Sequence, residues 1–337
     1  MKLLFKERKS CVLSPSTLRC LNDTYTLNPT SGCVHLCSYC YARGYSNYPG
    51  DGIVVLYSNI AKKLEDELDR KRKLPSFVYF SPSCDVFQPV KEVLDTTFCL
   101  MNALLERGIG VSFLTKGHIT EKFMALFKKY NNIVQAHIGI TTLNSRIQRL
   151  LEPHAAIPII RLKNISSLIN IGIMPEIRLD PLIPCLTDSD NNIDSLFKIL
   201  GGLGVRSVGL NYLFLRPKIQ KNLRNTLSNT RVSVKVFEAF YNSVDLSLLT
   251  GQPASQSRTV ENNGCPDRTV CRSGNSMVVA LNLQFRERGY GRITSHAGKY
   301  GIMTHVCGCK NPDVTKELAC RDIWNNYFDK RKTVVNY

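Results

Sequence analysis

Three closely spaced cysteines constrain this chain more than any other feature of its sequence. Cys33, Cys37 and Cys40 follow Asn28-Pro29 in the arrangement C-x3-C-x2-C. Three thiolates on one short loop can hold three corners of a [4Fe-4S] cluster and leave the fourth iron open to a small molecule. A structural zinc site is the alternative, but zinc sites usually use C-x2-C pairs, so the spacing favours the iron–sulfur cluster.

The composition indicates a globular chain without a membrane-spanning segment. With 337 residues, 43% of them hydrophobic, the chain can bury one large core, with or without an appendage. Residues 1–10 are charged and lack the apolar core of a signal peptide, and no stretch is long and apolar enough to span a bilayer. We therefore expect a cytoplasmic protein with no membrane partner, whose 13 cysteines are metal ligands or thiols rather than disulfides.

The charge is strongly positive. Lysine and arginine number 44 against 27 aspartates and glutamates, which gives a formal net charge of +17. Such an excess favours a polyanionic partner, because each phosphate that a cation neutralises releases counterions. Nucleic acid is the partner we expect. A basic protein without such a partner, or one that binds an acidic protein or metabolite, is the alternative.

Short apolar runs alternate with amphipathic stretches along most of the chain. Strands are expected at residues 25–28, 77–80, 111–114, 133–140, 173–179 and 205–210. Helices are expected at residues 58–72, 94–106, 121–129, 157–170 and 193–200. This alternation predicts right-handed βαβ units and a parallel sheet. A partial barrel and a flavodoxin-like doubly wound sheet would both produce it.

The cysteine loop decides between these folds through a resemblance. Asn28-Pro29, Gly32 and Tyr39-Cys40-Tyr41-Ala42-Arg43 resemble the signature of the radical S-adenosylmethionine (SAM) superfamily, in its spore photoproduct lyase-like, DNA repair photolyase-like branch. The resemblance implies an α/β fold, a partial (β/α)6 TIM-type barrel at residues 24–215. A basic N-terminal lead-in (1–23) and a cysteine-containing C-terminal extension (216–337) would flank it.

The resemblance also implies a lyase-like enzyme. Its [4Fe-4S] cluster, on Cys33, Cys37 and Cys40, would take an electron from a reductant such as flavodoxin or ferredoxin and cleave SAM to a 5′-deoxyadenosyl radical. Together with the charge, the resemblance points to a nucleic-acid substrate, DNA before RNA, and to repair or modification of a base. The alternatives are radical modification of RNA, a peptide or a metabolite, and a non-catalytic iron–sulfur protein that binds nucleic acid or senses redox state.

Residues at the ends of the expected strands are candidates for binding SAM, because ligands bind at the carboxyl ends of parallel strands. The stretch from Ser81 to Pro89 resembles the family segment that approaches the methionine part of SAM, where Ser83 and Asp85 would bind the ammonium group. Lys116 follows the next strand, and the resemblance implies that it faces the SAM carboxylate.

Further candidates lie on other loops. Thr141 and Thr142 would hydrogen-bond the ribose or the methionine end of SAM, and Tyr39 would lie against a flat ring bound near the cluster. Glu152 and Arg161 belong to the same pattern and are either functional or paired with each other.

Cys84 is the candidate catalytic residue. In spore photoproduct lyase a cysteine on this loop donates the hydrogen atom that quenches the product radical, and Cys84 lies in a comparable Ser-Cys setting. A thiol is a good hydrogen-atom donor because its S–H bond is weak. The alternative is a partly buried cysteine that only packs, which is how Cys11, Cys20, Cys99 and Cys185 are interpreted.

The C-terminal part of the chain contains a second group of cysteines that exceeds what packing needs. They are Cys265, Cys271, Cys307, Cys309 and Cys320. Four of the five could ligate a second iron–sulfur cluster or a zinc ion, and scattered thiols are the alternative. Before this group, residues 212–229 carry four basic side chains and no acidic one, which favours contact with phosphates.

Overall fold

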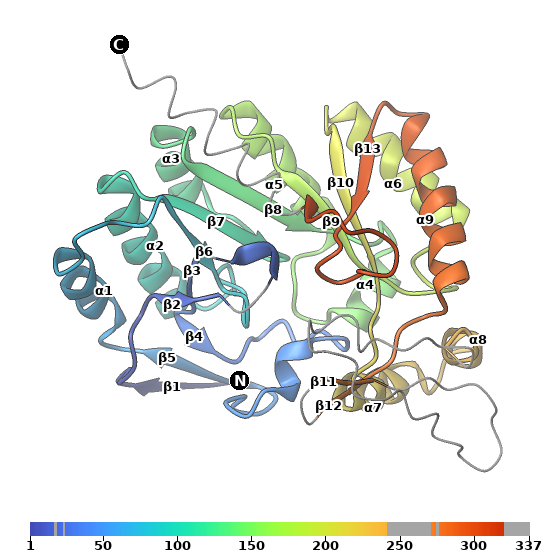
Figure 1. Cartoon of the computed structure of the whole chain (residues 1–337), viewed down its shortest axis with the longest axis horizontal. Coiled ribbons are helices and arrows are strands. Elements are labelled where there is room, and N and C mark those ends of the chain that lie inside the picture. Colours follow the sequence, from blue (N-terminus) through green and yellow to red (C-terminus); the bar gives the residue numbers. More distant parts are fainter. Residues whose placement is uncertain (17–18, 23, 241–270, 274–275, 320–337) are drawn as a thin grey trace.

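The computed structural model describes residues 1–16, 19–22, 24–240, 271–273 and 276–319 (Figure 1). The strands of its main sheet are β2 (Ser14–Pro15), β3 (Tyr25–Leu27), β6 (Phe77–Phe80), β7 (Gly110–Thr115), β8 (Val134–Gly139), β9 (Glu176–Leu182), β10 (Ser207–Tyr212) and β13 (Met303–Val306). Their order in the sheet is β13-β10-β9-β8-β7-β6-β3-β2. Every neighbouring pair is parallel except β2 and β3.

Helices connect these strands. They are α1 (Ile60–Asp69), α2 (Lys91–Glu106), α3 (Glu121–Lys129), α4 (Ser145–Leu151), α5 (Pro158–Asn170), α6 (Asp190–Gly202), α7 (Pro217–Leu227), α8 (Val232–Glu238) and α9 (Leu283–Gly298). Figure 1 shows α2 and α3 beside β6 and β7, and α6 and α9 beside β10 and β13. The consecutive order from β3 to β10 excludes a flavodoxin-like sheet, in which the strand order reverses. The predicted α/β fold, a partial TIM-type barrel, is confirmed.

The sequence missed one strand of this barrel and one small sheet. β13, in the predicted C-terminal extension, pairs in parallel with β10, with Leu210 opposite Val306. The extension therefore continues the sheet. A separate three-stranded sheet consists of β1 (Lys2–Lys6), β4 (Thr30–Ser31) and β5 (Ile53–Tyr57). Short elements complete the described chain: η1 (Arg19–Leu21), η2 (Tyr41–Gly44), β11 (Cys271–Ser273) and β12 (Ser276–Val278).

The core lies between the sheet and its helices. Ile60, Leu64 and Leu68, the apolar positions that predicted α1, are at most 2% exposed. Phe87 packs edge-to-face on Phe113 of β7, with ring centroids 5.0 Å apart. Such aromatic pairs stabilise a core beyond the apolar area that they bury. In the part of the chain that the structure describes, no helix has the length and apolar character needed to cross a membrane.

Candidate cluster and cofactor site

The loop that carries Cys33, Cys37 and Cys40 starts directly after β4 and ends at η2. Its path requires a glycine at its start: Gly32 has φ +84°, and a Cβ there would lie 2.3 Å from the carbonyl oxygen of Ile53. Leu36 also adopts a positive φ, +52°, which is uncommon for a residue with a side chain. The backbone is therefore wound tightly between the first two cysteines.

The surroundings of the three cysteines fit an iron–sulfur cluster. Burial and the Asp85 carboxylate raise the pKa of Cys33, and burial and the Glu152 carboxylate raise the pKa of Cys37. Thiolates in this setting need the positive charge of bound metal. Within the described residues, His35 Nε2 and Ser38 Oγ of this loop are buried without a hydrogen-bond partner. Buried polar atoms of this kind, next to the cysteines in sequence, would be available as hydrogen-bond donors to a bound cluster.

Asp85 connects this loop to the ends of β6 and β7. Its Oδ1 accepts hydrogen bonds from Thr115 Oγ1 at 2.7 Å and from the Phe87 amide at 2.9 Å. Its Oδ2 accepts one from the Lys116 amide at 2.8 Å and lies 3.4 Å from His35 Nδ1. Burial alone would raise the pKa of Asp85, but His35, the Lys116 amide and the Thr115 hydroxyl lower it to about 2. The carboxylate therefore holds the loops together, and its predicted contact with the SAM ammonium stays a prediction.

A buried polar chain lies on the other side of the cysteine loop. The Tyr39 hydroxyl donates a hydrogen bond to Glu152, which forms an ion pair with Arg161. Both charged side chains are at most 2% exposed, and Arg161 Nη1 also donates to the Gly139 carbonyl at 2.9 Å. Glu152 and Arg161 thus pair with each other, which was one of the two interpretations of their motif. The Tyr39 hydroxyl points into this chain.

Lys116 lies at the end of β7, where the sequence predicted it. Its Nζ is 5.6 Å from the centroid of the Tyr39 ring. Its side chain passes close to Gly139, where a Cβ would lie 3.1 Å from the Lys116 Nζ, closer than ordinary van der Waals contact. Among the residues that the structure describes, its ammonium makes no hydrogen bond or ion pair. An ammonium held in this way is available for a ligand carboxylate.

The remaining SAM candidates have partners within the protein. The Ser83 amide donates to Asn28 Oδ1 at 3.1 Å. Thr142 Oγ1 donates to Asn192 Oδ1 at 2.7 Å, and the carbonyl of Thr141 accepts from Asn192 Nδ2 at 2.9 Å. Both threonines are buried, at the carboxyl end of β8. Both threonines therefore lie at the predicted strand end, and the Thr142 hydroxyl stabilises the loop through its hydrogen bond to Asn192.

Cys84 lies beside the start of the cysteine loop. Its Sγ is 3.3 Å from Ser81 Oγ and 3.9 Å from Asn28 Oδ1. Burial raises the pKa of this thiol. Cys84 therefore keeps its S–H bond at neutral pH, which a hydrogen-atom donor requires. The donor role stays a prediction.

Two residues that join the loops had no assigned role in the sequence. The Asn28 Oδ1 atom accepts hydrogen bonds from the Ser83 amide and the Cys84 thiol. Gln88 is fully buried, accepts from the Val34 amide at 2.9 Å and donates to Thr30 Oγ1 at 3.2 Å. Their roles could have been predicted from Asn28-Pro29 and Gln88-Pro89. A polar residue before proline in both loops indicates a specific backbone conformation.

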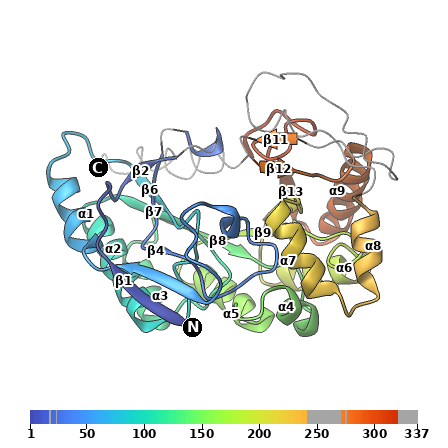
Figure 2. The same cartoon turned by 90° about the horizontal axis from the view of Figure 1, so that it is seen from below.

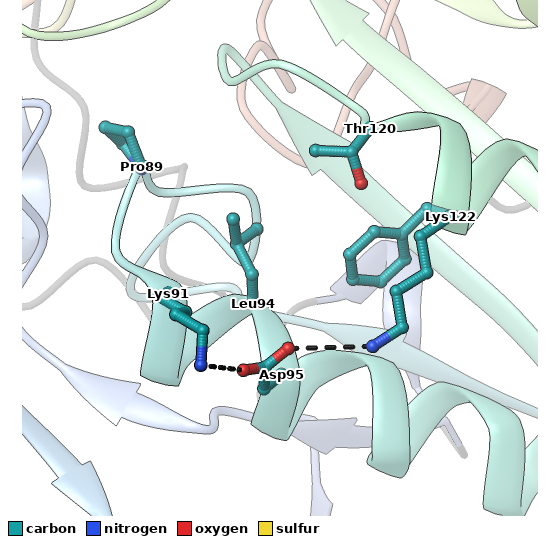
Figure 3. Close-up of a pocket in the computed structure, with 7 residues that line it drawn as sticks. Pro89, Lys91, Leu94, Asp95, Thr120 and Lys122 are labelled. Carbon is teal, nitrogen blue, oxygen red and sulfur yellow. Dashed lines mark ion pairs between the residues drawn. The ribbon is translucent and has the colours of Figure 1, made fainter.

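A surface pocket of about 380 Å³ lies between the starts of α2 and α3 (Figure 3). Asp95 of α2 forms an ion pair with Lys91 of the same helix at 3.4 Å and one across the pocket with Lys122 of α3 at 3.6 Å. None of the residues predicted to bind the cluster or SAM lines this pocket. It is separate from the predicted site.

The predicted second cysteine group is only partly visible. Cys307 and Cys309 lie together, with their Sγ atoms 3.0 Å apart. Cys265 and Cys320 lie outside the described residues, and Cys271 starts β11 with its side chain outside them. The third thiol that the structure places with Cys307 and Cys309 belongs to Cys20, for which the sequence predicted a packing role.

The family model of the radical SAM superfamily matches residues 27–190 of this chain, just under half of its length. The cysteine loop described above fits the [4Fe-4S] cluster and SAM that such domains use. The fold of the chain is that of spore photoproduct lyase. A mutant of that lyase superposes with a TM-score of 0.62 at 11% identity, covering 90% of this chain and 82% of the lyase. A complex of the lyase with dinucleoside spore photoproduct gives 0.60 at 13% identity, with the same coverage.

Curated relatives match over a shorter range. An uncharacterized Mycobacterium tuberculosis protein is 28% identical over 201 residues, which cover 57% of this chain and 59% of that protein. The radical SAM Nalpha-GlyT isomerase of Pseudomonas phage M6 is 27% identical over 187 residues, 55% of this chain and 38% of the isomerase. The match thus spans less than two thirds of each relative.

Replacing Lys116 with glutamine is expected to weaken SAM binding about 10- to 100-fold, because one charge-assisted hydrogen bond to the SAM carboxylate would be lost. The Kd for SAM, measured anaerobically on cluster-loaded protein, tests this. Lys122→Gln is the matched control, since its Nζ also lies over an aromatic ring, at 4.2 Å from the Phe98 centroid. Unchanged affinity in Lys116→Gln would remove Lys116 from the SAM site.

Proposed function

We propose that this radical SAM enzyme acts on a nucleic acid, with a DNA base as the substrate to be repaired or modified. In this proposal Cys33, Cys37 and Cys40 hold the cluster, and Ser83, Lys116, Thr141 and Thr142 line the SAM site. When bound, the cluster and SAM supply one-electron chemistry beside the substrate. The surrounding residues orient the reactants and exclude water.

The observation that carries the proposal is a pair of exposed tyrosines directly after the last cluster cysteine. Tyr41 is 44% exposed and Tyr45 is 39% exposed, and their ring centroids are 5.9 Å apart in an edge-to-face arrangement. Burial raises the pKa of Tyr45, and the nearby positive charges of Arg216 and Lys310 oppose that rise. Exposed aromatic rings flanked by cations are typical of surfaces on which bases stack and phosphates bind.

The basic segment predicted to contact phosphates continues this surface. It forms α7, which packs against η2, the turn that carries Tyr41. Lys218, Lys221 and Arg224 of α7 are exposed. The spacing of three residues places them on adjacent positions of the helix surface. A phosphate backbone bound along α7 would bring a base, extruded from its stack, toward the cysteine loop.

The structural relatives support this substrate class. Spore photoproduct lyase, whose fold the chain shares, binds a dinucleoside photoproduct in one of its solved structures. The formal charge of +17 is in line with a polyanionic substrate. The phage relative is named an isomerase, so related domains are found in proteins with different reactions.

The test uses anaerobically reconstituted full chain and measures 5′-deoxyadenosine formed from SAM with UV-irradiated DNA, undamaged DNA and RNA. Stimulation by irradiated DNA supports repair, and stimulation by undamaged DNA supports base modification. Stimulation by RNA alone, or by neither nucleic acid, would refute the DNA proposal.

A charge variant tests the surface itself. With Lys218, Lys221 and Arg224 all changed to glutamine, the plot of log K against log salt for DNA binding should lose about 2 to 3 units of slope, since each phosphate contact contributes about 0.9. The matched control changes Lys62, Lys128 and Lys129 to glutamine. These residues are exposed on α1 and α3, which lie on the far side of the molecule from α7 (Figures 1 and 2). An equal loss of slope in the control would assign the effect to overall charge.

A further inference from the structure

Three cysteines from distant parts of the sequence meet in the folded chain. The Sγ atoms of Cys20, Cys307 and Cys309 all lie within 4.8 Å of one another. Cys20 is 9% exposed and Cys307 is 3% exposed. Leu21, Phe77 and Tyr79 belong to the same small apolar cluster. This group is separate from the three cysteines of the radical SAM motif.

The segment that carries Cys307 and Cys309 is held in place by its own hydrogen bonds. The amides of Lys310 and Asn311 both donate to the Cys307 carbonyl at 3.1 Å. A Cβ on Gly308 would lie 2.4 Å from the carbonyl oxygen of Thr315, so the closely packed turn between the two cysteines requires glycine.

A buried side-chain network fixes the same turn. Arg286 of α9 is fully buried, and its Nη1 donates to Asn311 Oδ1 at 3.0 Å and to Asp313 Oδ1 at 3.1 Å. The hydroxyl of Tyr290 donates to the same Asn311 oxygen at 3.2 Å. The turn is therefore shaped by protein contacts, and its two thiols are presented to Cys20 in a preorganised arrangement.

The spacing of the sulfurs distinguishes between the two kinds of metal centre. A tetrahedral zinc ion with Zn–S bonds of about 2.3 Å places its thiolates about 3.8 Å apart. In a [4Fe-4S] cluster each cysteine binds a different iron, which separates the sulfurs further. The three sulfurs of the described triad lie within 4.8 Å of one another, and one pair is 3.0 Å apart, which is nearer to the spacing around a single ion than to the wider spacing in a cluster.

We propose that Cys20, Cys307 and Cys309 bind one zinc ion. Cys20 lies between β2 and β3, at one edge of the main sheet, and Cys307 directly follows β13, at the other edge. In Figure 1 the dark blue segment after β2 and the red segment after β13 approach each other across the open side of the barrel. The ion therefore joins the two edges of the incomplete barrel.

The proposal does not depend on the substrate, so it is tested without a turnover assay. The full chain with Cys33, Cys37 and Cys40 changed to alanine is supplied with zinc, desalted and analysed for metal. About one zinc per chain is expected, and Cys20→Ser, Cys307→Ser and Cys309→Ser should each reduce it at least tenfold. Cys11→Ser and Cys99→Ser, at exposed positions, are the controls and should retain the zinc. Zinc content that is unaffected by Cys20→Ser would overturn the proposal.

A second measurement avoids variants that fail to fold. X-ray absorption at the zinc edge of the otherwise unaltered, iron-reconstituted chain should show sulfur at about 2.3 Å from a single zinc ion. A chain that binds about eight irons and no zinc would instead hold a second iron–sulfur cluster at the triad. That result would overturn the proposal. A chain that retains no zinc would overturn it as well.

Discussion

Changing Cys37 to alanine is expected to abolish SAM cleavage. Loss of a residue that supports a metal ligand commonly costs 10- to 100-fold, so loss of a ligand itself should reduce the rate by more than about 100-fold. Cys37 is the middle cysteine of the loop, and its pKa, raised by burial and by Glu152, leaves a neutral thiol unless metal is bound. The measurement is iron and sulfide per chain together with 5′-deoxyadenosine formation under reductant.

Cys99→Ala is the matched control, because Cys99 is exposed on α2. It should keep both the iron content and the activity of the unaltered chain. Full iron loading and SAM cleavage in Cys37→Ala would show that the cluster lies elsewhere. Circular dichroism of both metal-free variants distinguishes loss of a ligand from loss of the fold, since equal spectra show that Cys37→Ala is still folded.

Changing Glu152 to glutamine is expected to lower the free energy of unfolding by about 3–5 kcal/mol, because it leaves the Arg161 guanidinium buried without its partner charge. Asp95→Asn is the matched control. Asp95 pairs with Lys91 and Lys122 at the surface, where its side chain is 52% exposed, and loss of such a pair costs less than about 1 kcal/mol. Urea unfolding of the metal-free chains at pH 7 measures both.

The effect of Glu152 should also depend on pH. Burial alone would raise the pKa of Glu152, but Arg161 and Lys116 lower it below its ordinary value. A carboxyl group with a lowered pKa in the folded state stabilises the protein above its unfolded pKa, and this contribution is lost as the pH falls through the folded pKa. The difference between the unaltered chain and Glu152→Gln should therefore narrow below about pH 4. An equal difference at all pH values would contradict the ion-pair explanation.

The sequence predicted the local elements of the barrel well because their patterns are local. The strand at residues 77–80 and the helix at 121–129 have the observed bounds of β6 and α3. β13 was missed because its four residues, Met-Thr-His-Val, have a mixed pattern and become a strand only by pairing with β10. Such non-local pairing overrides weak local propensity.

The candidate site was predictable where the motif is contiguous and was incomplete where contacts cross the chain. Lys116 was identified by its place after a strand together with the family resemblance; it lies beside the Tyr39 ring, and its contact with SAM stays a prediction. The contact of the Tyr39 hydroxyl with Glu152 joins residues that the sequence places far apart. Cys20 had no neighbouring cysteine to identify it as a metal ligand, and only the folded chain brings it to Cys307.

The cysteine loop also depends on residues that bind no metal themselves. Gly32 provides its backbone conformation, Gln88 accepts a hydrogen bond from the Val34 amide, and Asp85 lies 3.4 Å from His35 Nδ1. Residues that orient metal ligands commonly matter almost as much as the ligands do. The geometry of the three cysteines is therefore encoded in parts of the sequence that lie outside the cysteine motif.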